Sequence, residues 1–324
     1  MLPEQLPPTP ILDRLLTRGD QISTPAGTLE TLLLERFGLP AETGTAPYAL
    51  KADDPRWDEQ GWWLHAEPVH LRADLDRLRL YDSRHLGIEP AEARALADAF
   101  NAHFAGDGLR LCAPSPQRWY LHAENPPRIT THPLSEVAGR SIEPFLPTGD
   151  DARRWAGLMN EAQMLFHQHP VNQAREAAGR PAINGLWTWG GGRWAAIERP
   201  ADLAAIYADL PLATGLATAA EVPILAPTAD ALRLQLQGDH LLIQHACQSA
   251  VLDADAPAWC EAVAALDAEL APALDALRNG RLAALVVDTG DGSRHRFRRS
   301  ALPRFRRRGK PLAARVATTA TGPS

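Results

Sequence analysis

Hydrophobic and polar positions change their spacing three times within residues 160–192. Apolar side chains recur near helical spacing over residues 158–166, which predicts a helix with one buried face. Pro170 should end that helix, because proline lacks a backbone N–H, and a second short helix is expected directly after it. Residues 186–189 then predict a short buried strand, which ends in three glycines at 190–192.

The remaining pattern predicts a mixture of helices and strands without an internal repeat. Helices are predicted at residues 11–18, 29–37, 90–104, 202–220 and 256–277. Strands are predicted at residues 62–71, 109–113, 118–123, 241–247 and 282–288. Pro68 marks the first strand as an edge strand or a bulged one, because proline cannot donate a hydrogen bond to a sheet. The strand, helix and two strands over residues 62–123 indicate a small α+β unit.

Composition and charge are those of an ordinary globular protein. The chain has 324 residues, 45% of them hydrophobic and 22% charged, with a net charge of −6. This length suffices for one large domain or two smaller ones. No segment resembles a signal peptide, and no apolar run reaches the ~20 residues that a membrane-spanning helix needs. The widely spaced Cys112, Cys247 and Cys260 suit neither a disulfide framework nor a zinc site, so we expect a cytoplasmic protein.

The three glycines at 190–192 admit two interpretations. A strand that runs into glycines is often the carboxyl edge of an α/β sheet, where the backbone approaches a ligand closely. The same residues also suit a sharp turn without a ligand. No lysine followed by serine or threonine comes after them, which excludes a P-loop.

Four polar residues near these glycines are candidates for ligand binding. His169, Asn172 and Arg175 recur every three residues and could share one face of the second helix, with Asn184 in the turn that follows. In one interpretation they form a pocket for an anion, and Arg175 pairs with its phosphate or carboxylate. In the other, the asparagines and histidines cap and brace the turns of the chain.

The most uneven charge lies between Arg294 and Lys310, where nine residues are lysine or arginine. An anionic ligand, another protein or a nucleic acid could lie against this strip, and Phe297 and Phe305 could stack on bases. The alternative is a solvated terminal strand and tail. The sequence contains no helix-turn-helix, aromatic RNA-binding motif or zinc finger, so nucleic acid is not the expected partner.

The order of the segments resembles one family, the archaeal-type cofactor-independent phosphoglycerate mutases of the alkaline phosphatase superfamily. The most specific match is HPVNQAREAAGRPAINGLWTWGGG, residues 169–192, where the mutases carry a very similar run. Weaker matches are ILDRLLTRG (11–19), PAGTLETLLLERFG (25–38), EPAEARALADAFNAHF (89–104), LATGLATAAEV (212–222) and LAALVVD (282–288). Within the superfamily, the chain looks most similar to RpfE-type regulatory proteins.

The resemblance implies an α/β fold with an alkaline-phosphatase-like, mostly parallel core sheet flanked by helices, and a smaller α+β insert domain. Residues 1–54 and 146–316 would form the core, residues 55–145 the insert, and residues 317–324 a disordered tail.

The same resemblance implies a chemistry, because these mutases hold two divalent metal ions and transfer a phosphoryl group through a serine. Thr28 occupies the place of that serine, where its hydroxyl could be a nucleophile or cap the following helix. Of the metal ligands, only Asp288 remains, with His295 as a stand-in, and two ligands are too few for a two-metal site. The first aspartate ligand and a glycine-histidine motif have no counterpart. HAEPVHL (65–71) replaces the substrate-binding run.

Two functions are therefore expected as alternatives. In the first, the chain is a non-catalytic phosphoglycerate mutase-like protein with a regulatory or ligand-binding role, no cofactor, and a phosphorylated small molecule or a protein as partner. In the second, it is a metal-dependent phosphoglycerate mutase or phosphohydrolase with Thr28 as nucleophile and manganese or a similar ion. The missing ligands favour the first, and the second requires further ligands from Asp239, His240, His245 or Asp253.

Overall fold

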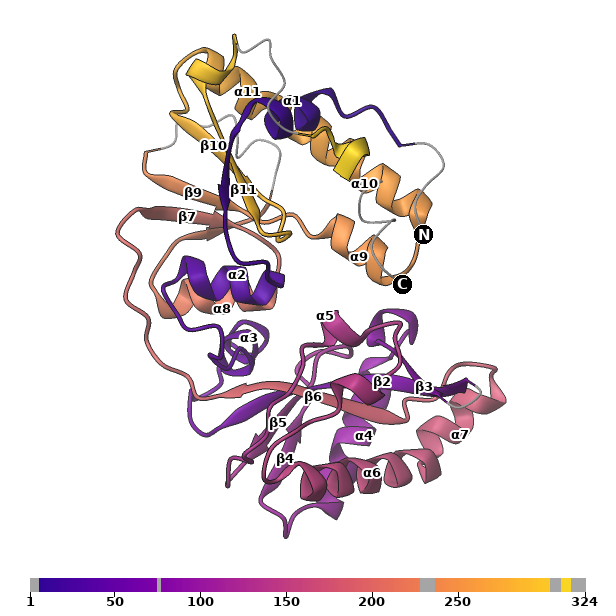
Figure 1. Ribbon diagram of the computed structural model, residues 1–324. Helices are drawn as coiled ribbons and strands as arrows, with labels where there is room; N and C mark the ends of the chain where they lie inside the picture. The colour runs from indigo at the N-terminus through magenta and orange to yellow at the C-terminus, as the bar shows by residue number, and fades with distance from the viewer. Residues whose placement is uncertain (1–5, 75–76, 228–236, 304–309, 316–324) are drawn as a thin grey trace. The chain divides into compact units, whose positions relative to one another are not determined.

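The computed structural model describes residues 6–74, 77–227, 237–303 and 310–315 (Figure 1). The chain forms two compact units, each assembled from separate stretches of sequence. Unit 1 comprises Met1–Arg36, Arg199–Asp209 and Glu221–Ser324, and unit 2 comprises Phe37–Glu198 and Leu210–Ala220. The expected insert, residues 55–145, lies within unit 2, and its boundaries as a separate domain stay a prediction. The expected disordered tail lies outside the described residues.

Unit 1 contains two three-stranded sheets among its described residues. The first is antiparallel in the order β1-β11-β10, from β1 (Asp20–Ser23), β11 (Ser293–Arg298) and β10 (Ala284–Asp288). The second is parallel in the order β8-β7-β9, from β8 (Ile224–Leu225), β7 (Leu203–Tyr207) and β9 (Asp239–Leu242). The helices are α1 (Pro10–Arg18), α2 (Leu29–Arg36), α9 (Ala246–Leu252), α10 (Ala256–Glu269) and α11 (Ala271–Arg278).

One face of the antiparallel sheet packs against α1, α10 and α11. Phe297 of β11 and Leu277 of α11 are fully buried in this apolar cluster. The buried carboxylate of Asp267 on α10 accepts hydrogen bonds from the N–H groups of Ile11 and Leu12, at 2.9 and 2.7 Å. These N–H groups belong to the first turn of α1 and have no partner within the helix, so α10 supplies the cap that α1 lacks.

Unit 2 is built around an antiparallel sheet in the order β3-β2-β5-β4, with β6 also paired to β2. Its strands are β2 (Trp63–Asp74), β3 (Arg77–Tyr81), β4 (Leu109–Cys112), β5 (Tyr120–Ala123) and β6 (Gly185–Gly192). Its helices are α3 (Ala46–Asp53), α4 (Pro90–His103), α5 (Leu134–Val137), α6 (Ala152–Gln168), α7 (Pro170–Ala177) and α8 (Pro211–Ala219). None of the helices in the described ranges is long and apolar enough to cross a membrane.

The long strand β2 is central to this sheet. Its first residues pair with β5 on one side, its last residues pair with β3 on that same side, and β6 runs along the other side. The N–H of Ala66 donates to Trp119 on the β5 side, and residues two apart direct their N–H positions to the same side. Pro68, which has no N–H, therefore faces the gap between the β5-paired and β3-paired parts. The register of β2 against β6 is irregular between Trp63 and His65 but continuous at Pro68, and β2 is not an edge strand, so the expectation of an edge or a bulge at Pro68 is wrong.

The two faces of the unit 2 sheet carry different layers (Figure 1). Leu64 of β2 packs with α4 and α6 in an apolar cluster to which Phe100 and Phe166 contribute fully buried rings. Its neighbour Trp63 points to the opposite face and packs against Leu50 of α3. The amphipathic helix predicted at residues 90–104 is thus confirmed, and its apolar stripe is the face that covers the sheet.

Three sequence-based expectations need correction. The expected mostly parallel core sheet is not found among the described strands, where only β7, β8 and β9 pair in parallel. Residues 202–220 form strand β7 followed by helix α8, because Pro211 starts the helix and the apolar run before it is short enough for a strand. Residues 256–277 form two helices, α10 and α11, which meet at Leu270 just before Pro272.

Candidate functional site

The four candidate ligand residues of the resemblance segment lie on α7 and in the turn that leads into β6. His169 is the N-cap of α7, and its Nδ1 accepts a hydrogen bond from the N–H of Val171 at 3.2 Å. Burial lowers the pKa of His169, which favours the neutral ring that can accept this bond. The His169 side chain therefore satisfies one of the free N–H groups at the start of the helix.

Asn172 is fully buried and uses its amide to join α6, α7 and the start of β6. Its Nδ2 donates to the carbonyl oxygens of Phe166 and Ile183, both at 2.8 Å. Its Oδ1 accepts from the N–H of Ile183 at 2.7 Å. Both amide donors and the amide oxygen are therefore engaged within the chain.

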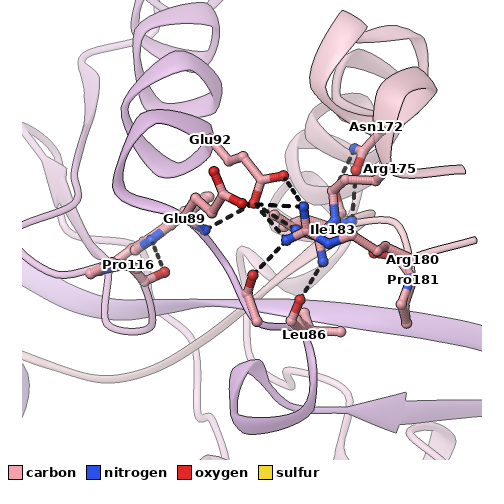
Figure 2. A network of polar contacts seen from close by, with 11 residues as sticks. Leu86, Glu89, Glu92, Pro116, Asn172, Arg175, Arg180, Pro181 and Ile183 are labelled. Carbon is pink, nitrogen blue, oxygen red and sulfur yellow. Dashed lines mark hydrogen bonds and ion pairs between the residues drawn. The ribbon is translucent and has the colours of Figure 1, made fainter. Parts of the chain in front are cut away.

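Arg175 is the most enclosed charge of the segment, with a side chain that is 1% exposed (Figure 2). Its Nε donates to Pro181 O at 2.8 Å, its Nη1 to Glu92 Oε2 at 2.6 Å, and its Nη2 to Leu86 O at 2.5 Å. Arg180 shares the same carboxylate, with its Nη1 3.1 Å from Glu92 Oε1. The guanidinium of Arg175 thus connects α7 to α4, to the loop before α4 and to the turn before β6.

Asn184 fixes the entry of β6 beside β2. Its Oδ1 accepts from the N–H of Leu71 at 2.7 Å, and its Nδ2 donates to Leu71 O at 2.9 Å. The amide thereby imitates the backbone of one further strand residue. Its own N–H donates to Val69 O at 3.1 Å, which continues the β2–β6 pairing.

The three glycines at the end of β6 lie against other parts of unit 2. A Cβ atom on Gly190, which has a φ of +61°, would lie 2.4 Å from Thr45 Oγ1. A Cβ on Gly191 would lie 2.4 Å from the ring of Trp62, and one on Gly192 would lie 2.9 Å from Gly44 Cα. Close approach of the chain to itself therefore explains why these positions hold glycine.

The contacts of residues 169–192 agree with the alternative in which the polar side chains cap and brace the turns of the chain. All four polar side chains are engaged with the chain, and the glycines accommodate neighbouring side chains and backbone. A ligand at Arg175 would have to displace Glu92 or a backbone carbonyl. Ligand binding by these residues stays a prediction.

Thr28 and Asp288 are brought near one another in unit 1. The N–H of Gly27 donates to Gly290 O at 3.1 Å, which places the loop before α2 beside the turn between β10 and β11. Thr28 Oγ1 lies 3.4 Å from the N–H of Thr31, the position of a helix-capping hydroxyl. Asp288 accepts from the N–H of Gly290 at 3.0 Å and from Nε of Arg294 at 2.5 Å.

His295 does not join this group. In the β10–β11 pairing, Asp288 lies opposite Arg294, and Val287 lies opposite His295. Successive side chains of a strand point to opposite faces, so Asp288 and His295 lie on opposite faces of the hairpin. The imidazole of His295 is 1% exposed, neither ring nitrogen has a hydrogen-bond partner among the described residues, and burial lowers its pKa.

The side chains present do not fit a two-metal site. Within the described ranges, no three histidine, cysteine, aspartate or glutamate side chains are grouped so as to hold a metal ion. The further ligands that the enzyme alternative requires are dispersed or engaged: His245 pairs with Asp209 at 3.1 Å, and Asp239 lies 3.9 Å from Arg36. No step of a reaction can be assigned to a metal on these residues.

A buried polar cluster in unit 2 was not singled out from the sequence. His65 stacks on Trp189, with ring centroids 4.0 Å apart, and its Nε2 lies 3.2 Å from Thr45 Oγ1. Burial lowers the pKa of His65 to about 3, so its ring is neutral at physiological pH. Nearby, the phenol of Tyr120 donates to Asp53 Oδ2 at 2.7 Å. In the sequence, the alternation in HAEPVHL (65–71) indicates that His65 and Glu67 lie on one face of a strand, but it does not indicate the other members of this cluster.

The basic strip begins on β11, where the arginines lie on one face of the strand and Phe297 lies on the other. Phe297 is fully buried on the face that packs against the helices, so its ring is not available for stacking on bases. Arg294, Arg296 and Arg298 alternate with the buried residues and face the other way. Phe305 and most of the remaining basic residues lie outside the described residues.

Comparison of the sequence with curated proteins gives matches to one class of enzyme, the 2,3-bisphosphoglycerate-independent phosphoglycerate mutases. The mutase of Methanosarcina barkeri is 26% identical over 172 residues, 48% of this chain and 43% of that protein. The mutase of Methanosarcina acetivorans is 24% identical over 57% of this chain and 48% of that protein. A probable mutase of Geobacter sulfurreducens is 30% identical over 33% of this chain and 27% of that protein. No protein-family model matches the sequence.

Solved structures give weaker likenesses, both at 16% sequence identity. The cofactor-independent phosphoglycerate mutase of Thermoplasma acidophilum aligns over 94% of this chain and 86% of its own, with a TM-score of 0.44. A protein of Pyrococcus horikoshii aligns over 83% of this chain and 71% of its own, with a TM-score of 0.49. Neither score establishes a shared fold. From its sequence, the chain is a weakly similar relative of the 2,3-bisphosphoglycerate-independent phosphoglycerate mutases that spans about half the length of the first curated proteins it matches.

Proposed function

We propose that the chain is a non-catalytic relative of the cofactor-independent phosphoglycerate mutases, with a regulatory or ligand-binding role. The proposal includes the RpfE-type regulatory assignment and a phosphorylated small molecule or a protein as partner. The sequence similarity to the mutases supports the family part of the proposal. The loss of catalysis is inferred from the side chains at the expected catalytic positions.

One observation carries this inference: Asp288 and His295 lie on opposite faces of the β10–β11 hairpin. They cannot ligate the same ion without rearrangement of the sheet. Asp288 is further neutralised by Arg294, which also bonds Glu35 at 2.8 Å. A metal ion at Asp288 would have to displace an arginine from its carboxylate, and no third ligand stands nearby among the described residues.

A second candidate function is a phosphohydrolase or mutase with Thr28 as nucleophile. The Gly27–Gly290 hydrogen bond favours it, because it brings Thr28 beside the turn that holds Asp288. A hydroxyl nucleophile needs a base or a metal to remove its proton. The Thr28 oxygen is instead positioned to accept from the N–H of Thr31, as an N-cap does.

The deciding experiment measures metal content together with turnover. The purified protein is analysed for bound divalent metal, and phosphatase and phosphoglycerate mutase activity are measured with added manganese. The proposal expects no stoichiometric metal and no turnover above the blank. Stoichiometric metal, with turnover that Thr28→Ala abolishes, would refute it and leave the enzyme alternative.

A pair of variants at Thr28 separates the cap from the nucleophile. Thr28→Ala removes the hydroxyl, and Thr28→Ser keeps it. If the hydroxyl only caps α2, the alanine variant loses roughly 1 kcal/mol of stability, the serine variant loses little, and neither changes turnover. Turnover that is lost in alanine and kept in serine would assign the hydroxyl to catalysis.

Ligand binding is tested by calorimetric titration with 3-phosphoglycerate and with inorganic phosphate as separate probes. Saturable binding of 3-phosphoglycerate in a protein without turnover supports the ligand-binding role. If Arg175 holds the ligand, binding disappears in Arg175→Lys while the variant remains folded, because lysine cannot reproduce a forked contact. Binding that persists in this variant places the ligand elsewhere.

A further inference from the structure

The antiparallel sheet of unit 1 ends at β1, a four-residue strand that pairs only with β11 among the described strands. A strand at the end of a sheet leaves half of its backbone N–H and C=O groups without a partner strand. Gln21, Ile22 and Ser23 are all exposed, and 39% of Ile22 remains accessible. Among the described residues, three of the four side chains of this strand are exposed, and no strand pairs with its outer edge.

The register identifies which backbone groups point outward. The N–H of Thr24 donates to Gly292 O at 3.0 Å, so residue 24 bonds toward β11. Because alternate residues bond to the same side, Ile22 also bonds toward β11, where it lies opposite Arg294. Gln21 and Ser23 then direct their N–H and C=O groups outward. No hydrogen bond to these outward groups is formed by the residues that the structure describes.

In two strands of unit 2, an amide side chain bonds to outward backbone groups. β4 is the last strand of the unit 2 sheet, and Asn101 of α4 bonds both Leu111 N–H and Leu111 O, at 2.6 and 2.9 Å. Asn184 does the same for Leu71 on β2. Such amides prevent the addition of a further strand at that point. β1 has no such side chain within the described part of the chain.

We propose that the outer edge of β1 pairs with the same edge of a second copy of the chain, antiparallel and centred on Ile22. A two-fold axis through this residue sets Gln21 opposite Ser23 of the second copy. Both residues direct their backbone groups outward, so each of these two pairs can exchange two hydrogen bonds. The exposed Ile22 side chain then meets its own copy in the close, non-hydrogen-bonded pair between them.

The charges that would face each other and the small buried area indicate how strong this contact can be. Asp20 would lie opposite Thr24 of the second copy, so the pairing brings no like charges face to face. Strands of four residues bury far less than the roughly 1,200 Å² of a standard interface, which predicts a weak, concentration-dependent dimer. The inference does not depend on the proposed function, since it involves neither Thr28 nor Asp288.

Cysteine cross-linking tests the register directly. In Ile22→Cys, the two thiols of a pair would lie within disulfide range, because such cross-strand residues have Cα atoms about 4.5 Å apart. The matched control is Val286→Cys, at a comparably exposed valine on β10, the opposite edge of the same sheet. Wild type gives the background from the partly buried Cys112, Cys247 and Cys260. With oxidised glutathione, the expected result is a covalent dimer from Ile22→Cys alone.

A second pair of variants tests the hydrogen bonds without introducing a thiol. Gln21→Pro removes an outward N–H, which an edge strand tolerates, and Gln21→Ala keeps it. In sedimentation experiments over rising concentration, wild type and Gln21→Ala should shift from one chain toward two, and Gln21→Pro should not. The proposal is overturned if wild type stays monomeric, if both cysteine variants cross-link equally, or if Gln21→Pro still dimerises.

Discussion

Replacing Arg175 by methionine tests whether the segment most similar to the mutases is a brace of the fold. Methionine replaces the aliphatic part of the arginine side chain and has no donors, so the change removes the charge and all three hydrogen bonds. Leu86 O and Pro181 O would lose the bonds from Arg175. Glu92 would keep its contact with Arg180 and the hydrogen bond from the N–H of Glu89 at 2.9 Å. The perturbation therefore acts on α7, α4 and the loop before α4 at once.

The size of the effect follows from burial. Removal of one partner from a buried ion pair typically costs about 3–5 kcal/mol, because the other charge is left uncompensated. Arg180 still faces Glu92, which places the expected loss for Arg175→Met near the lower end, at about 3 kcal/mol. Domains of this kind are stable by about 5–15 kcal/mol, so the loss is readily measured.

The assay is equilibrium unfolding in urea, followed by tryptophan fluorescence and circular dichroism. The matched control is Arg180→Met, which touches the same carboxylate from a side chain that is 34% exposed. Exposed ion pairs contribute little, so Arg180→Met should lose no more than about 1 kcal/mol. An Arg175→Met protein as stable as Arg180→Met would refute the bracing interpretation and return Arg175 to the candidates for ligand binding.

The remaining predictions concern two helix glycines and two buried histidines. Gly215→Ala in α8 should destabilise the protein by about 1–3 kcal/mol, because its Cβ would lie 1.8 Å from Tyr48 O. Gly157→Ala in α6, where a Cβ meets open space, should stabilise by about 0.5–1 kcal/mol in the same urea titration, and the reverse order would contradict the packing. Burial lowers the pKa of His65 from 6.5 to about 3, so the unfolded state takes up its proton first, and stability falls as pH drops below 6.5. Between pH 6 and 4.5, wild type should lose up to about 1.4 kcal/mol per pH unit more than His65→Gln, and equal slopes would show that the ring is protonated in the folded state. His295→Leu should stabilise by about 1–3 kcal/mol, since it removes a buried ring without hydrogen-bond partners among the described residues, and a lower unfolding midpoint would argue against that environment.

Local patterns predicted the elements whose hydrophobic face is continuous in sequence. The helix at residues 90–104 and the α6–Pro170–α7 boundary are examples, because spacing and proline act within one turn. The prediction of one helix at residues 202–220 was wrong because a short apolar run fits a strand and a helix equally well. The burial of β7 in a parallel sheet depends on β8 and β9, which come later in the chain.

The candidate site could be predicted only as a set of residues, without their roles. Arg175 in the sequence is compatible with an anion site, and its partner Glu92 lies in a different helix that no local pattern links to it. Glycines at 190–192 indicate close approach, but the sequence does not show that the approaching groups are Gly44, Thr45 and Trp62. The opposite orientation of Asp288 and His295 follows from strand alternation once the register of β10 and β11 is known.

The division of the chain into units also sets an order for folding during synthesis. Unit 2 is complete once residue 220 has been made, and its central pairing of β2 with β6 can close before then. Unit 1 joins β1, near the amino end, to β11, near the carboxyl end, so its antiparallel sheet must wait for almost the entire chain. Chains fold as they emerge, and distant pairings form slowly. A ribosome-bound nascent chain should therefore hold a folded unit 2 while α1 and β1 remain without their partners.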